Sequence, residues 1–168
     1  MKFSVEIAGC GADLERVREI YFSEAFGDAV AQAAGLLERK QSEHAVLQGG
    51  IERTRTRVVP RLALPSSVQK LLRGQVVRYD EVVEYDPSTR QARFSIRSLA
   101  GKRVQVNGTI HFLQDGSGVR LRFDGEAKIA VFGLGTMLER YLVGEVTTRY
   151  ARAQDVLQRF IDEDPAAA

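Results

Sequence analysis

The sequence predicts an α+β fold in which a curved antiparallel sheet of about seven strands is closed by a long C-terminal helix. Three observations lead to this prediction. An alternating N-terminal segment precedes two short helical segments, a series of segments with period two follows, and an amphipathic segment ends the chain. This order is typical of helices that cover one side of an antiparallel sheet, because each element must bury its apolar face against another.

The composition is that of a globular protein, with 168 residues, 44% hydrophobic residues and a net charge of +2. This length favours a single domain, which we expect over residues 1–163, with a disordered tail at 164–168. The small net charge and the interleaved signs argue against a nucleic-acid partner. Cys10 is the only cysteine. We expect no disulfide, no signal peptide and no transmembrane helix, and therefore a cytoplasmic location.

The first third of the chain predicts one strand and two helices. Residues 2–9 alternate between apolar and polar side chains, which indicates a half-buried strand ended by two glycines. Asp13 is placed to cap a helix that extends to about Phe22. A second, alanine-rich helix is expected from Ser23 to Ala34.

Six further strands are predicted from the period of two and from turn residues between them. The expected strands span residues 36–46, 51–59, 75–85, 90–99, 102–114 and 118–131. A short helical insert is expected from Ser66 to Leu72, where Gly74 stops it.

The last predicted element is a helix over residues 133–163, about 45 Å long at 1.5 Å per residue. Its apolar positions are spaced by three and four and form one face. They are Leu134, Leu138, Leu142, Val146, Tyr150, Ala153, Leu157 and Phe160.

The two best-patterned strands predict their own pairing. A hairpin turn at Gly116-Ser117 places Gly108 directly opposite Gly125 on the apolar face. The same register sets Phe112 beside Leu121 and Ile110 beside Phe123. The facing glycines have two interpretations that remain open together: a bend in a strongly curved sheet, or space for a ligand.

With these elements in place, the chain resembles the helix-grip fold of START-like proteins and polyketide cyclases, the SRPBCC superfamily. Within it, the chain is similar to a bacterial domain family of unknown function. The similarity is carried by Met1–Ile7, Leu64–Leu72, Gln75–Tyr85, and the stretch from Gly125 into the final helix. The resemblance covers almost the whole chain. It implies a cavity between helix and sheet that holds an apolar molecule such as a lipid, a sterol or a polyketide.

Glu81 is the most unusual residue of the predicted sheet, because it shares the more apolar strand face with Tyr79 and Tyr85. A carboxylate there is either paired or desolvated. One hypothesis makes it a polar contact inside the cavity, together with the two tyrosines. The alternatives are an ion pair with an arginine of a neighbouring strand, or a strand edge where the carboxylate reaches water.

Three arginines, Arg53, Arg55 and Arg57, fall on one face of a strand. That face is the solvated side of the sheet in one interpretation. In a second, the arginines point inward, where one could neutralise Glu81 or bind a ligand carboxylate. In a third, they form an exposed anion-binding stripe.

Two other segments have open interpretations. The segment Arg61–Arg73 mixes leucines with positive charge, so it could pack on the body, cover the cavity or make transient membrane contact. Glu145 and Arg149 are four residues apart, which fits an ordinary surface pair. Beside Tyr141, they could instead line the pocket.

No catalytic residue, metal site or cofactor is predicted. The sequence has no nucleophile elbow and no phosphate-binding loop. His111 is expected to point to solvent and His44 to lie near a hairpin end, so neither has the convergent partners of a metal ligand.

The first functional hypothesis is therefore a non-enzymatic carrier or sensor that binds a hydrophobic small molecule, as a monomer or a homodimer. The expected ligand-binding residues are Tyr79, Glu81, Tyr85, Phe94, Gly108, Ile110, Phe123, Gly125, Leu138, Leu142, Val146 and Tyr150. The second hypothesis is an enzyme of the cyclase or aromatase kind, with Glu81 or a cavity tyrosine as acid or base. The third is an interaction module whose cavity is filled by its own side chains.

Overall fold

The structure, a computed structural model, describes residues 1–61, 66, 69–70, 77–98, 104–130, 133 and 135–163. Its elements are β1 (Lys2–Cys10), α1 (Leu14–Phe22), α2 (Glu24–Ala33), β2 (Glu38–Val46), a 3-10 turn η1 (Gln48–Gly50), β3 (Glu52–Val59), β4 (Tyr79–Asp86), β5 (Gln91–Ser98), β6 (Val104–Asp115), β7 (Gly118–Ile129) and α4 (Gly135–Asp162). The predicted α+β order with a long closing helix is confirmed. Most of the predicted insert at Ser66–Leu72 and of the segment Arg61–Arg73 lies outside the described residues, as does the tail at 164–168.

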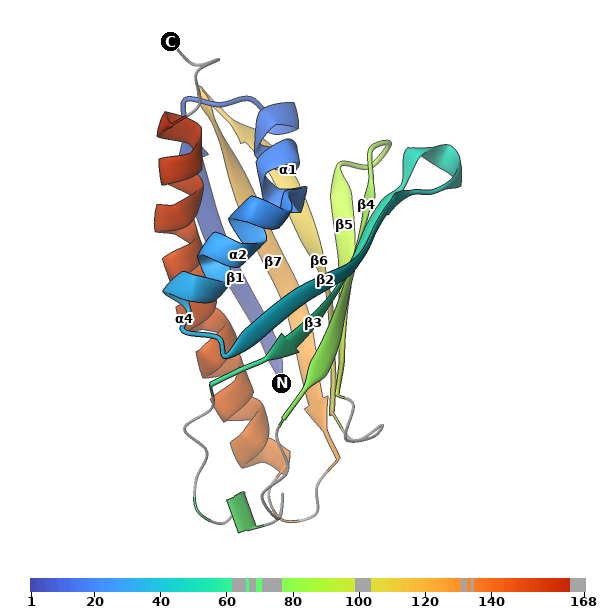
Figure 1. Ribbon diagram of the computed structural model, residues 1–168, viewed down its shortest axis with the longest axis vertical. Helices are drawn as coiled ribbons and strands as arrows, with labels where there is room; N and C mark the ends of the chain where they lie inside the picture. Colours follow the sequence, from blue (N-terminus) through green and yellow to red (C-terminus); the bar gives the residue numbers. More distant parts are fainter. Residues whose placement is uncertain are drawn as a thin grey trace.

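The strands form one seven-stranded sheet in the order β1-β7-β6-β5-β4-β3-β2. All neighbouring strands are antiparallel. The helices lie on one side of this sheet, with α4 along β1 and β7 and with α1 and α2 packed between α4 and the other strands (Figure 1). The space between the helices and the sheet holds the core.

The predicted register of β6 and β7 is confirmed. Gly108 pairs with Gly125, Ile110 with Phe123, and Phe112 with Leu121. The apolar face of this hairpin is buried against the helices, whereas the opposite face carries polar side chains. This arrangement follows from the period of two, which sends successive side chains to opposite faces.

The space in front of the two facing glycines is occupied by the protein's own rings. A Cβ atom on Gly108 would lie 2.5 Å from Cζ of Phe94, and one on Gly125 would lie 2.5 Å from Cζ of Phe3. The Phe3 and Phe94 ring centroids are 6.5 Å apart. The glycines therefore make room for aromatic packing, which corrects the interpretation that they leave space for a ligand.

Helices α1 and α2 begin and end at capping residues. Asp13 accepts a hydrogen bond from the Arg16 amide at 2.8 Å, as the sequence predicts for an N-cap. Helix α2 ends at Ala33, and Gly35 two residues later has φ 66°. The Leu36 amide donates to the Ala31 carbonyl at 2.9 Å. This left-handed turn redirects the chain and aims Leu36 toward the space below α2.

Helix α4 packs closely on β1. A Cβ atom on Gly9 would lie 2.6 Å from Cδ1 of Ile161, so any larger residue there would require the Ile161 side chain to shift. Strand β1 does not end at Gly9 but continues to Cys10. Gln158 of α4 accepts from the Cys10 amide at 2.9 Å and donates to the Cys10 carbonyl at 3.1 Å. The helix thus supplies hydrogen-bonding groups to the outer edge of β1.

Candidate functional site

Two cavities lie between the helices and the sheet. The larger has a volume of about 470 Å³ and is bounded by the α2–β2 link, the inner faces of β4, β5 and β6, and α4. Most of its wall is apolar, with Leu36, Val77, Ile96, Val104, Val106, Leu142 and Val146. A space of this size and lining suits a small organic molecule.

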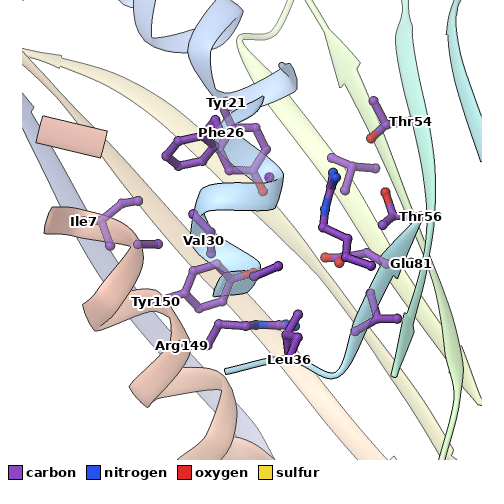
Figure 2. Close-up of a pocket in the computed structure, with 16 residues that line it drawn as sticks. Ile7, Tyr21, Phe26, Val30, Leu36, Thr54, Thr56, Glu81, Arg149 and Tyr150 are labelled. Atoms are coloured by element: carbon purple, nitrogen blue, oxygen red, sulfur yellow. The ribbon is translucent and has the colours of Figure 1, made fainter. Parts of the chain in front are cut away.

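The smaller cavity, of about 110 Å³, lies beneath α2 and is more polar. Thr54 and Thr56 enter it from β3 and Glu81 enters it from β4. Arg149 and Tyr150 project into it from α4, facing Glu81 and the two threonines (Figure 2). Polar groups from β3, β4 and α4 therefore converge on one partly open space.

Arg149 lines both cavities, as Leu36 does. Its Nη1 donates a hydrogen bond of 2.6 Å to the Tyr79 hydroxyl, which faces the larger cavity. Glu81 lies on the other side, in the smaller cavity. The guanidinium is therefore part of the wall between the two spaces.

The surroundings of Arg149 hold it in the charged form. Tyr79 and then Glu81 raise the pKa of Arg149, against the opposite effect of burial. Burial, followed by the charge of Glu81, raises the pKa of Tyr150 above its ordinary value. Near neutral pH Arg149 therefore stays charged and the Tyr150 phenol stays neutral.

The arginine whose pKa the charge of Glu81 raises, Arg149, comes from helix α4 and not from a neighbouring strand. Arg53, Arg55 and Arg57 lie on the outer face of β3 and pair there with acidic side chains. The pairs are Arg53 Nε with Glu84 at 2.7 Å, Arg55 Nε with Glu43 at 3.6 Å, and Arg57 Nε with Asp80 at 3.0 Å. The interpretation in which these arginines point inward is therefore wrong, because the inner face of β3 carries Glu52, Thr54 and Thr56.

The structure brings five of the predicted ligand-binding residues to the cavities. Tyr79, Leu142 and Val146 line the larger one, and Glu81 and Tyr150 line the smaller one.

The other predicted ligand-binding residues lie elsewhere in the fold. Tyr85, Ile110 and Phe123 are fully buried in the packed core, where the Tyr85 ring centroid is 5.1 Å from that of Phe112. Phe94 packs over Gly108 and Gly125. Leu138 is half-buried on α4 and is not part of either cavity wall.

Several cavity residues were not singled out from the sequence, above all Leu36 and the two threonines of β3. Arg149 and Glu145 line the larger cavity, as one interpretation of their spacing expected, although neither was among the predicted ligand-binding residues. The spacing did contain a signal for Arg149, since it follows Val146 by three residues and precedes Ala153 by four. The predicted surface pair with Glu145 is not among the ion pairs of the described residues. Arg149 turns to Tyr79 instead, and Glu145 lies at the larger cavity.

A second buried polar cluster links α1 to the β2–β3 hairpin. Glu52 is 8% exposed and accepts hydrogen bonds from Arg18 and, at 2.7 Å, from His44 Nε2. It lies outside both cavity walls, and we assign it a structural role.

The described part of the chain contains no group of three or more His, Cys, Asp or Glu side chains that could hold a metal ion. None of the helices in that part is long and apolar enough to span a bilayer.

A family described as "Protein of unknown function (DUF2505)" matches residues 3–161 of the sequence. A comparison with curated proteins yields no match.

Solved structures match over almost the whole length. A protein from Thermus thermophilus has a TM-score of 0.67 and 17% identity, with 96% of this chain and 97% of that chain covered. The Zhui aromatase/cyclase from Streptomyces sp. R1128 has a TM-score of 0.60 and 15% identity, with 99% and 96% covered. A START superfamily protein from Mycobacterium smegmatis has a TM-score of 0.59 and 16% identity, with 95% and 97% covered. At these identities the likeness shows the fold alone, which is the START-like helix-grip fold.

Proposed function

Because this chain belongs to the DUF2505 family of proteins of unknown function, we propose its function from its own geometry: it binds a hydrophobic small molecule between the sheet and α4, as a carrier or a sensor. The observation that carries the proposal is the cavity of about 470 Å³ with a mainly apolar wall. Ligand pockets typically have volumes of about 300–1,000 Å³ and a few polar groups that orient the ligand.

The position of the cavity supports this proposal. The core is tightly filled at Gly108 and Gly125, where aromatic rings close the space. It is open beneath Leu142 and Val146, one to two helical turns before Tyr150. Burial of an apolar ligand against this wall would contribute about 25 cal/mol for each Å² of apolar surface removed from water.

A cavity-filling variant tests the proposal. Leu142→Trp places a large ring in the larger cavity, whereas Leu113→Trp adds the same ring on the outer face of β6, where Leu113 is 38% exposed. We expect the unmodified protein to bind the neutral dye Nile red in stoichiometric amount. Leu142→Trp should weaken this binding about tenfold or more and Leu113→Trp should leave it unchanged. If no dye binds, or if both variants bind like the parent protein, the proposal is wrong.

A second candidate function is acid–base catalysis of the cyclase or aromatase kind. It is favoured by one observation: Glu81 and the Tyr150 ring line the same cavity. The carboxylate would act as the acid or base. Incubation with a poly-β-ketone thioester, followed by the absorbance of an aromatic product, tests this function. Turnover that Glu81→Gln abolishes without loss of substrate binding would support it, and no turnover by the parent protein would exclude it for that substrate class.

A further inference from the structure

We propose that the larger cavity selects ligands that carry an anionic head group, a carboxylate on an apolar body, and that Arg149 together with Tyr79 binds this group. The inference rests on the proposed function and names the chemical class of its ligand. It concerns a head-group site at the part of the larger cavity's wall that Arg149 and Tyr79 form together.

Arg149 has hydrogen-bonding capacity left for a ligand. A guanidinium carries five N–H donors in a planar fork, and one of them, on Nη1, is used by the Tyr79 hydroxyl. The side chain is half-buried, and it lines both cavities. A cation at this depth is screened less by salt than a cation at the surface.

Tyr79 adds a second donor at the same place. Its oxygen accepts the hydrogen bond from Arg149, so its own O–H can donate to another acceptor. Tyr79 faces the larger cavity, and so does Arg149. A carboxylate has two oxygens and could accept from the guanidinium and the phenol together. Such charge-assisted bonds are about twice as strong as those between neutral groups.

The other charged side chains at the larger cavity carry a net positive charge, like Arg149. Arg61 and Arg152 are exposed and line it, and Glu145 is the acidic residue among the described lining residues. Arg152 also donates to the Ala33 carbonyl at 3.0 Å. Because these three side chains are in contact with water, they contribute little to affinity, but two cations against one anion favour the approach of an anion.

Glu81 offsets the charge of the Arg149 guanidinium within the protein itself. It faces Arg149 from the smaller cavity, and its charge acts on the guanidinium. A ligand carboxylate would share Arg149 with Glu81, which makes Glu81 a competitor of the head group. The same arrangement disfavours a cationic ligand, because Arg149 separates the larger cavity from the Glu81 carboxylate.

The test uses matched probes that differ only in the head group. Dodecanoate, dodecan-1-ol and dodecylammonium share one aliphatic chain, and anthracene-9-carboxylate and 9-anthracenemethanol share one aromatic body. Titration calorimetry at neutral pH gives each affinity, and the two bodies distinguish a fatty-acid-like ligand from a polycyclic one. We expect at least one carboxylate to bind about tenfold or more tightly than its alcohol, with the ammonium compound weakest.

Three variants of the full chain locate the head-group site. Arg149→Gln should remove the advantage of the carboxylate while the alcohol binds as before, which also shows that the variant is folded. Glu81→Gln should raise the carboxylate affinity, because the competing charge is gone. Arg159→Gln removes an exposed guanidinium of α4 that lies outside both cavity walls, and it should change the ratio of the two affinities by less than about twofold.

The outcomes separate the inference from the proposed function. If neither alcohols nor carboxylates bind, the cavity is not a ligand site and both fail. If the alcohols bind as tightly as the carboxylates, or the ammonium compound binds best, the anion selectivity is wrong and the ligand-binding function stands. A carboxylate preference that survives in Arg149→Gln, or a carboxylate affinity that falls in Glu81→Gln, would overturn the assignment of the head-group site.

Discussion

The ring of Phe94 on β5 lies where a side chain on Gly108 of β6 would be, with 2.5 Å between Cζ and the position of a Cβ atom. The two residues are directly paired across the strands. The absence of a side chain at one position thus accommodates a large one at its neighbour. This pairing accounts for the closed core at Gly108, in contrast to the open space that Ile96 and Val106, two residues along the same strands, share with Arg149.

The first prediction concerns this contact. Gly108→Ala should lower the free energy of unfolding by about 1–3 kcal/mol, because the new methyl group would collide with the Phe94 ring and with the Asp124 carbonyl oxygen. Gly144→Ala is the matched control, since a Cβ atom there would meet nothing within 4 Å on an exposed helix position. It should stabilise the protein by about 0.5–1 kcal/mol. Urea unfolding midpoints measure both, and a midpoint for Gly108→Ala equal to that of the parent would contradict the packing.

The second prediction concerns the buried carboxylate of Glu52. Glu52→Gln should destabilise the protein by about 1–3 kcal/mol, because Arg18 and His44 would lose a charged acceptor in a buried setting. Glu15 contacts Arg18 at 3.0 Å from the solvent side and is 65% exposed. Glu15→Gln should therefore cost no more than about 0.5 kcal/mol. Equal effects of the two substitutions in thermal or urea unfolding would show that the buried Glu52 carboxylate contributes no more stability than the exposed Glu15 carboxylate.

The third prediction concerns the coupling of Arg149 and Glu81. Each single substitution to Gln leaves the other charge without its neighbour, whereas the double variant removes both. We expect the destabilisation of the double variant to be smaller than the sum of the single effects, by about 0.5–2 kcal/mol. A double-mutant cycle from urea unfolding measures this difference. Strict additivity would show that the two charges do not interact.

The fourth prediction concerns alkaline pH. The pKa of Tyr150 is raised, first by burial and then by the charge of Glu81, above the ordinary value of 10.0. A raised pKa in the folded state gives stability that is fully present below the unfolded value and is lost as pH rises above about 10. The urea midpoint should therefore fall above this pH, and less steeply in Tyr150→Phe. Phenolate absorbance should show delayed ionisation of Tyr150, Tyr79 and Tyr21 in the folded protein.

The fold could be predicted because apolar and polar residues alternate strongly in several of the strands. In β6 and β7, a polar and an apolar face together with one turn define both the pairing and the inner side. Strand β3 is different, because both of its faces carry polar side chains. Its alternation groups Arg53 with Arg57 and Thr54 with Thr56, but it does not say which group faces the core.

The cavity walls were harder to predict for a physical reason. A cavity is a small difference between the space that a backbone encloses and the volume of the side chains in it. A pattern of apolar residues is the same whether Leu142 and Val146 touch the sheet or leave a gap. Arg149 adds a second difficulty, since its long side chain can reach either water or the interior from the edge of a helix stripe.

The two glutamines of α4 have a consequence for how copies of this protein can meet. An outer strand normally offers unpaired amide and carbonyl groups that can recruit a strand from another molecule. On β1, the Cys10 amide and carbonyl are already bound by Gln158, and the Ala8 amide is 3.4 Å from the Gln154 side chain. At the opposite edge, β2 has a bulge between Gln41 and Glu43. Each outer strand of the seven-stranded sheet thus carries a local feature that works against pairing with a strand of another molecule.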